Sequence, residues 1–139
     1  MVNAELFAVT GTCTGCVAAS DRKAVFIVLL DPNLNEVAAL LLEPNSSQAH
    51  FNNARLAAGD NTLYLAFNDE FFGGSHHLRA YDLNLNPLWA SFQNLAFVES
   101  PVQLFLQSGE LRLCAQEWTA NSNIGTRLIR WNASTGALL

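Results

Sequence analysis

The segment with the most chemically active side chains runs from Asn68 to His77 and reads NDEFFGGSHH. Carboxylates and imidazoles bind metal ions or exchange protons, so this segment predicts a candidate ligand site at Asp69, Glu70 and His76. Adjacent strand residues point to opposite faces, so only one of His76 and His77 can face a given site. The alternative is a polar loop with an apolar plug of two phenylalanines and a glycine hinge.

A second polar segment runs from Gln116 to Gly125 and contains Glu117 and Trp118 among asparagine and serine residues. An indole ring can stack on a sugar while polar groups orient it, so the composition is similar to that of sugar-binding loops. A glycan is therefore one hypothesis for the ligand of Glu117 and Trp118. The alternative is a tryptophan that packs across the end of a sheet.

The pair Cys13 and Cys16 encloses two residues, a spacing that suits a disulfide, a redox pair or half of a zinc site. A complete zinc site would need Cys114 together with His76 or His77. A disulfide or two free thiols is the favoured interpretation, because no helix is expected to follow the pair as in thioredoxin-type proteins. No complete catalytic group or ligand set is evident, so we expect no catalytic residues, no metal and no cofactor.

A recurring turn indicates how these segments are positioned. It begins at residues 31, 82 and 132, which are 51 and 50 residues apart, as DPNLN, DLNLN and NASTG. The first Asp or Asn can bond the backbone two residues on, and the final Asn or Gly tolerates a positive φ. Turns of this kind join two strands of a hairpin.

The residues around the turns have the apolar or alternating pattern of strands. Predicted strands cover 24–30, 36–42, 77–81, 87–92, 127–131 and 137–139 beside the turns, and 5–9, 55–58, 62–67, 102–106 and 110–115 upstream of them. No stretch has a sustained helical period, so little helix is expected.

The sequence therefore predicts an all-β fold of four-stranded antiparallel meander blades, arranged as a partial β-propeller. One array would cover 1–139, with blade one at about 5–44 without its first strand, blade two at about 54–93 and blade three at about 101–139. Blades that pack face to face bury what a lone sheet cannot. The connections Thr10–Lys23, Asn68–His76 and Gln116–Thr126 would then emerge on one rim, where loops carry function.

Two segments carry a resemblance to a known family. HLRAYDLNLNPLW (His77–Trp89) and RLIRWNASTGALL (Arg127–Leu139) resemble the strand–turn–strand of bacterial β-propeller repeats of the pyrroloquinoline-quinone type. Such repeats occur in quinoprotein dehydrogenases, assembly scaffolds and surface proteins, so the resemblance implies a fold more than a function. Propellers usually close with at least four blades, which implies further blades, self-association to complete a ring, or an open array.

Charge and hydropathy narrow the range of partners. The chain has 139 residues, with 7 Lys and Arg against 12 Asp and Glu, and no basic cluster that would bind phosphates, so nucleic acid is not expected. The longest apolar stretch, Ala24–Leu30, falls short of the roughly 20 residues of a membrane span. The N-terminus has no signal-peptide pattern. The sequence predicts no particular localisation. If the chain is part of a longer secreted propeller, the expected location is outside the cytoplasm.

Together these features favour a non-enzymatic propeller segment that acts as a binding or protein-interaction scaffold, with a protein or a glycan as ligand. A carbohydrate-binding module that uses the loop rim, chiefly Asp69, Glu117 and Trp118, is one alternative. A fragment of a quinoprotein-type oxidoreductase is the other, and it implies a quinone and a calcium ion with oxygen ligands.

Overall fold

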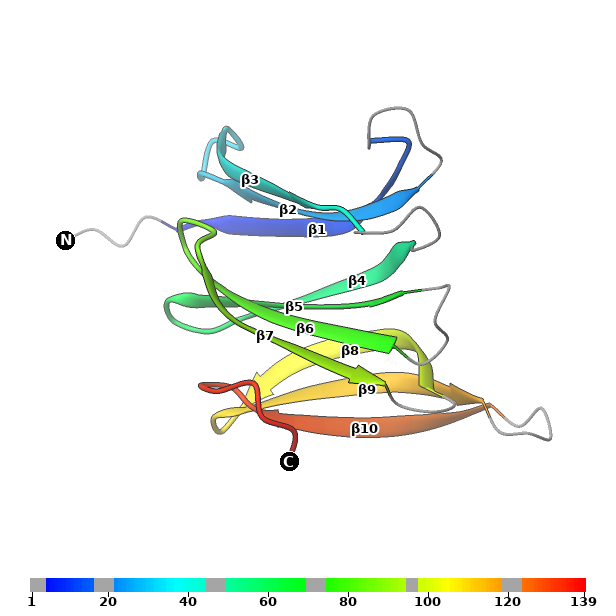
Figure 1. The fold of residues 1–139 in the computed structure, drawn as a ribbon. Coiled ribbons are helices and arrows are strands. Elements are labelled where there is room, and N and C mark those ends of the chain that lie inside the picture. The colour runs from blue at the N-terminus through cyan, green and yellow to red at the C-terminus, as the bar shows by residue number, and fades with distance from the viewer. Residues whose placement is uncertain (1–4, 17–21, 45–49, 70–74, 95–97, 119–123) are drawn as a thin grey trace.

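The computed structural model describes residues 5–16, 22–44, 50–69, 75–94, 98–118 and 124–139. Within these ranges ten strands form three antiparallel sheets, stacked one above the other in chain order (Figure 1). The first sheet contains β1 (Phe7–Thr14), β2 (Lys23–Leu30) and β3 (Glu36–Leu42). The second contains β4 (Phe51–Ala58), β5 (Thr62–Asp69), β6 (Ser75–Asp82) and β7 (Pro87–Asn94). The third contains β8 (Val98–Gln107), β9 (Glu110–Trp118) and β10 (Ile124–Asn132).

Each sheet is a meander, because strands that follow one another in the chain also pair with one another. The prediction of an all-β, antiparallel fold is confirmed. In the described part of the chain, no helix is long and apolar enough to cross a membrane.

The prediction of a fourth strand in the last blade is wrong for the described residues. The segment 137–139 forms only an isolated bridge, between Trp131 and Leu138. Only three residues of this sequence follow the turn after β10, which limits the pairing to that bridge. The third sheet therefore has three strands, as the first does.

The three long connections are shorter than expected. Strand β1 continues through the threonine-rich segment to Thr14, which pairs with Lys23. Threonine favours strands, and pairing satisfies backbone groups that a loop would leave to water. Likewise β5 extends to Asp69, paired with Ser75, and β9 extends to Trp118.

The first two repeated turns are held by their aspartates. Asp31 Oδ1 accepts the backbone N–H groups of Asn33 at 2.8 Å and Asn35 at 2.9 Å, and the Asn35 side chain donates to Oδ2 at 3.0 Å. These bonds lower the pKa of Asp31, and the side-chain bond from Asn35 has the largest effect. Asp82 is bound in the same way by the asparagines of the second turn.

The expected positive φ at the end of each turn occurs in only one of the three. Gly136 has φ 71°, but in the other turns the positive φ lies at Leu34, 65°, and Leu85, 61°, one residue before the final asparagine. The reason is that each final asparagine closes its turn through bonds to the leading aspartate. The third turn is one residue longer and closes from Asn132 N–H to the Ala137 carbonyl at 2.8 Å.

The centre of the second sheet is buried on both faces. Residues 63–69 of β5 are all buried, whereas a strand with one face in water alternates between buried and exposed residues. On one face Leu65 and Phe67 pack with Ile27 of the first sheet, and on the other face Ala66 packs with Leu113 of the third. Two apolar cores, one on each side of this sheet, therefore hold the stack together.

A tryptophan joins the second sheet to the third. Trp89 of β7 donates its indole N–H to the Ala133 carbonyl at 3.1 Å, and Ala133 lies in the turn after β10. Its ring covers Gly136 so closely that an added Cβ would lie 2.5 Å from the ring. Gly136 is therefore required by its positive φ and by the approach of Trp89.

The two strained leucines give opposite predictions on substitution. Leu34 is 69% exposed, so Leu34→Gly relieves a left-handed conformation without loss of packing and should stabilise the protein by about 0.5–1 kcal/mol. Leu85 is 8% exposed and belongs to the core, so Leu85→Gly should destabilise it by about 1–3 kcal/mol. Urea unfolding measures both, and two shifts of the same sign would contradict this account.

Candidate functional site

The strands that lead into the three predicted loops end on the same side of the stack. Strands β1, β5 and β9 all end on the right-hand side of Figure 1, which we call the loop rim and which is marked by Thr14, Asp69 and Trp118. Glu70 and the side chain of Trp118 lie outside the described residues. The glycan hypothesis therefore stays a prediction.

Four polar residues at the loop rim are buried. They are Asn68, Asp69, Ser75 and His76, with exposed fractions of 7%, 5%, 2% and 2%. They come from the paired ends of β5 and β6, where Asn68 is opposite His76 and Asp69 is opposite Ser75. Pairing of these two strands therefore brings the predicted site residues Asp69 and His76 into one buried polar group.

The alternation of strand residues divides this group between two layers. Phe67 packs toward the first sheet and Ala66 toward the third, so Asp69 faces the first sheet and Asn68 the third. His76 lies on the same face as Asn68, opposite to the face of His77. The carboxylate of Asp69 and the imidazole of His76 are close together in the sequence, but they therefore lie in different interfaces between sheets.

Asp69 holds His50, which connects the second sheet to the first. Its Oδ1 accepts the backbone N–H of His50 at 3.3 Å, and His50 Nδ1 accepts the backbone N–H of Lys23 at 3.3 Å. Nearby, the Thr12 hydroxyl donates to the Asn52 side chain at 3.2 Å. These bonds link the start of β2, the entry to β4 and the end of β5.

Glu117 lies in the other layer. It continues the row of Leu113 and Ala115, the side of β9 that faces the second sheet. Its carboxylate is 3.9 Å from the guanidinium of Arg127 in a partly exposed ion pair. Glu117 and His76 therefore lie on sheet faces that face each other, whereas Asp69 lies beyond the second sheet.

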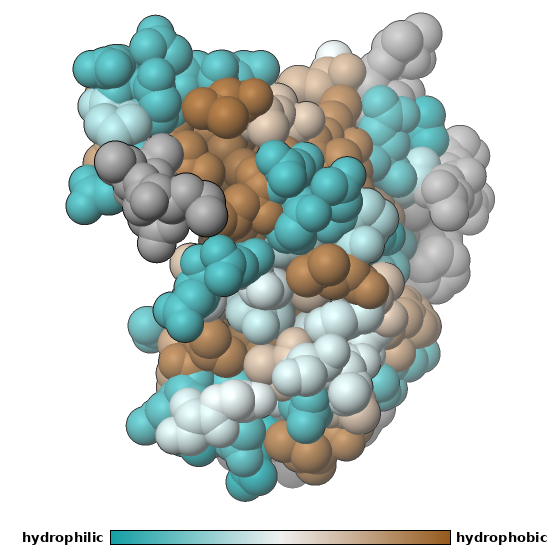
Figure 2. Space-filling model, turned by 90° about the vertical axis from the view of Figure 1, so that its left-hand side faces the viewer, coloured by the Kyte–Doolittle hydropathy of each residue, from teal (hydrophilic) through white to brown (hydrophobic). Residues whose placement is uncertain are grey.

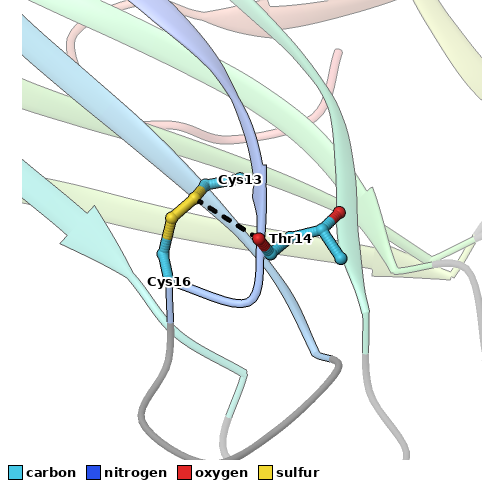
Figure 3. Close-up of a disulfide and its surroundings, with 3 residues drawn as sticks. All are labelled: Cys13, Thr14 and Cys16. Carbon is cyan, nitrogen blue, oxygen red and sulfur yellow. Dashed lines mark hydrogen bonds between the residues drawn. A yellow bond between two sulfur atoms is a disulfide. The ribbon is translucent and has the colours of Figure 1, made fainter.

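The cysteine pair closes the end of β1. Cys13 and Cys16 form a disulfide with their Cα atoms 5.8 Å apart, around a turn in which Gly15 has φ 75° (Figure 3). Cys114 is a free thiol in β9 of the third sheet, so it does not join the pair. Across the described ranges, no group of three or more His, Cys, Asp or Glu residues could hold a metal ion.

A row of rings crosses the second sheet, which the sequence analysis did not identify. The His77 ring stacks on Phe67, with centroids 4.7 Å apart and planes 5° apart, and it also contacts Phe51 and Phe92. Burial, followed by the positive charge of Arg79, lowers the pKa of His77 to about 4. Phe67, His77 and Phe92 lie directly opposite one another on three neighbouring strands, so the correct strand registers would have predicted this row.

An apolar hollow opens at the opposite end of the stack, where the turns lie. Its volume is about 410 Å³, and Asp60 is the one charged residue of its lining. The lining comes from β1, β2, β4, β5 and nearby turns, between the first and second sheets. Figure 2 views this end, and apolar side chains gather in its upper half.

The two outermost sheet faces differ in character. The outward residues of the first sheet are Phe7, Val9 and Gly11 of β1, Phe26, Val28 and Leu30 of β2, and Val37, Ala39 and Leu41 of β3. We call this set the open face. Phe7, Val9, Val37 and Leu41 are 50%, 45%, 55% and 39% exposed. A half-exposed set of large apolar residues on one sheet face is a feature of interaction surfaces.

The outward face of the third sheet carries charge instead. Glu110 forms ion pairs with Arg112 and Arg130, each at 3.1 Å. Arg112 also donates to the Gln107 side chain at 2.6 Å. We call this set, with Cys114 and Leu128, the charged face. Its polar groups are satisfied in water, as in the capping unit of a repeat array.

Comparison with known proteins does not assign this chain to a family. No family model matches the sequence, and no curated protein matches it significantly. The quinoprotein hypothesis therefore stays a prediction that rests on the repeat pattern.

His77 makes a prediction about pH. Its pKa is about 4 in the folded protein against 6.5 for an ordinary histidine, so the unfolded chain binds more protons between these values. The contribution of His77 to stability is therefore complete above a pH of about 6.5 and is lost as the pH falls toward about 4. Replacement His77→Phe keeps the ring row and removes the titration.

We expect the unfolding free energy of His77→Phe to fall less between pH 7 and 4 than that of the wild type. Urea unfolding at a series of pH values measures the two slopes. Equal losses in the two proteins would show that the buried imidazole does not titrate as described.

Proposed function

We propose that this chain is a non-enzymatic scaffold that binds another polypeptide through the open face of its first sheet. The observation that carries the proposal is the exposure of large apolar side chains on β1 and β3, the two strands that flank β2. Inside the molecule the same kind of face is covered, because Val25, Ile27 and Leu29 of β2 pack against the second sheet. The open face offers a partner the surface that sheets of this chain use to bind one another.

The proposal includes the partial β-propeller. Three meander sheets in chain order, a hairpin turn repeated every 50 or 51 residues, and the contact of Trp89 with the next turn are what consecutive blades would show. An array of blades buries the faces of its inner members and leaves only the end faces free. The charged face suits one free end, and the open face requires a partner at the other.

The loop rim is the less favoured binding surface. The two predicted site residues that the structure describes with buried side chains, Asp69 and His76, lie in different layers. Asp69 accepts the backbone N–H of His50, whose imidazole in turn accepts the backbone N–H of Lys23 in the first sheet. These residues support the architecture, whereas the open face has no such internal role.

Photocrosslinking tests the proposal. A photoreactive benzoylphenylalanine in place of Phe7, which is 50% exposed on the open face, should yield a covalent adduct with a polypeptide when the protein is irradiated in an extract of its own cells. The matched control carries the same group in place of Leu128, 51% exposed on the charged face. Adducts at neither position, or equally at both, would contradict the proposal.

A further inference from the structure

We infer that the partner of the open face is the open face of a second copy of this chain, in a dimer with twofold symmetry. The inference rests on the proposed function, because it names the occupant of the same surface. Two observations carry it, the composition of the open face and the charge of the opposite end, and the size of the sheet sets the expected strength of the contact.

The open face has no charged residue in its central rows. Val9, Val28 and Ala39 form one row across the three strands, and Gly11, Phe26 and Leu41 form the next. Glu36 marks the margin, opposite Leu30. A partner must therefore present an apolar surface of its own, because a charged one would lose its water without compensation.

One of the large rings of the open face lies down on the sheet. The Phe26 ring lies over Gly11, where an added Cβ would be 2.8 Å from the ring. The ring therefore rests against the sheet and fills the place of the missing side chain. Two such faces can approach to the roughly 10 Å at which packed sheets lie.

The charged face argues against head-to-tail assembly, in which the open face of one copy would contact the charged face of the next. That arrangement, which includes a ring closed by two copies, would bury Glu110, Arg112 and Arg130 against apolar residues. A twofold dimer instead joins two open faces and leaves a charged face at each outer end. Such an assembly is closed, because no apolar sheet face among the described residues is left to continue it.

The size of the sheet predicts the strength of the dimer. Strands of 7 or 8 residues make a face about 26 Å by 14 Å, on the order of 400 Å² per copy. Specific interfaces typically bury about 800 Å² per partner, so this contact is about half that size and falls among weak, transient contacts. We therefore expect reversible dimerisation with a dissociation constant in the micromolar range.

Sedimentation velocity of the full chain over roughly 1 to 500 µM tests the inference. The wild type should shift from monomer to dimer, and Val9→Lys should raise the dissociation constant at least about tenfold, since a lysine would be buried in the interface. Leu41→Lys, on β3 of the same face, serves as a second variant should Val9→Lys fail to fold. The matched control Leu128→Lys, on the charged face, should dimerise like the wild type.

Cys114 reports which face is buried. It alternates with the buried Leu113 and Ala115 and is partly exposed on the charged face, so a maleimide should label it equally in monomer and dimer. Protection of Cys114 on dimerisation, or loss of the dimer in Leu128→Lys, would establish head-to-tail contact and overturn the inference.

A folded monomer at every concentration would also overturn the inference. If the benzoylphenylalanine at position 7 then crosslinks to a different polypeptide, the proposed scaffold function stands and only the second copy is wrong. If neither dimer nor adduct is found, both proposals fail.

Discussion

The structure depends on burial of its second sheet from both sides. Every residue from Leu63 to Asp69 in β5 is buried, and its alternate side chains enter two separate apolar cores. Burial of this kind contributes about 25 cal/mol per Å², and neither outer sheet obtains it on more than one face. Polar contacts position the outer sheets: the bond from Lys23 N–H to His50 Nδ1 aligns the first sheet, and the bond from the Trp89 indole to the Ala133 carbonyl aligns the third.

The same constraint separates the roles of the two outer sheets. Each must offer an apolar inner face to the second sheet, but nothing inside the chain determines its outer face. On the third sheet that face is a network of Glu110 with Arg112 and Arg130. On the first sheet it is apolar and half exposed, and for this reason we place the binding surface of the scaffold there.

The sequence predicts more of the fold than of the site. Turns and strand periods are local, so Asp31, Asp82 and Asn132 place the hairpins correctly. The site depends on register: because β5 reaches Asp69, Asp69 lies opposite Ser75 and Asn68 lies opposite His76, so Asp69 and His76 are on neighbouring strands but face different layers. The positive φ at Leu34 and Leu85 could not be predicted for a similar reason. It depends on the side-chain bonds of the neighbouring asparagines and not on the conformational preference of leucine.

Native-state hydrogen exchange, followed by NMR, tests the central claim that the second sheet is stabilised from both faces. The account predicts that the backbone amides of Leu65 and Ala66 in β5 exchange most slowly, through global unfolding, while those of β3 and β10 exchange faster. Exchange of the β5 amides as fast as those of β3 and β10 would contradict it.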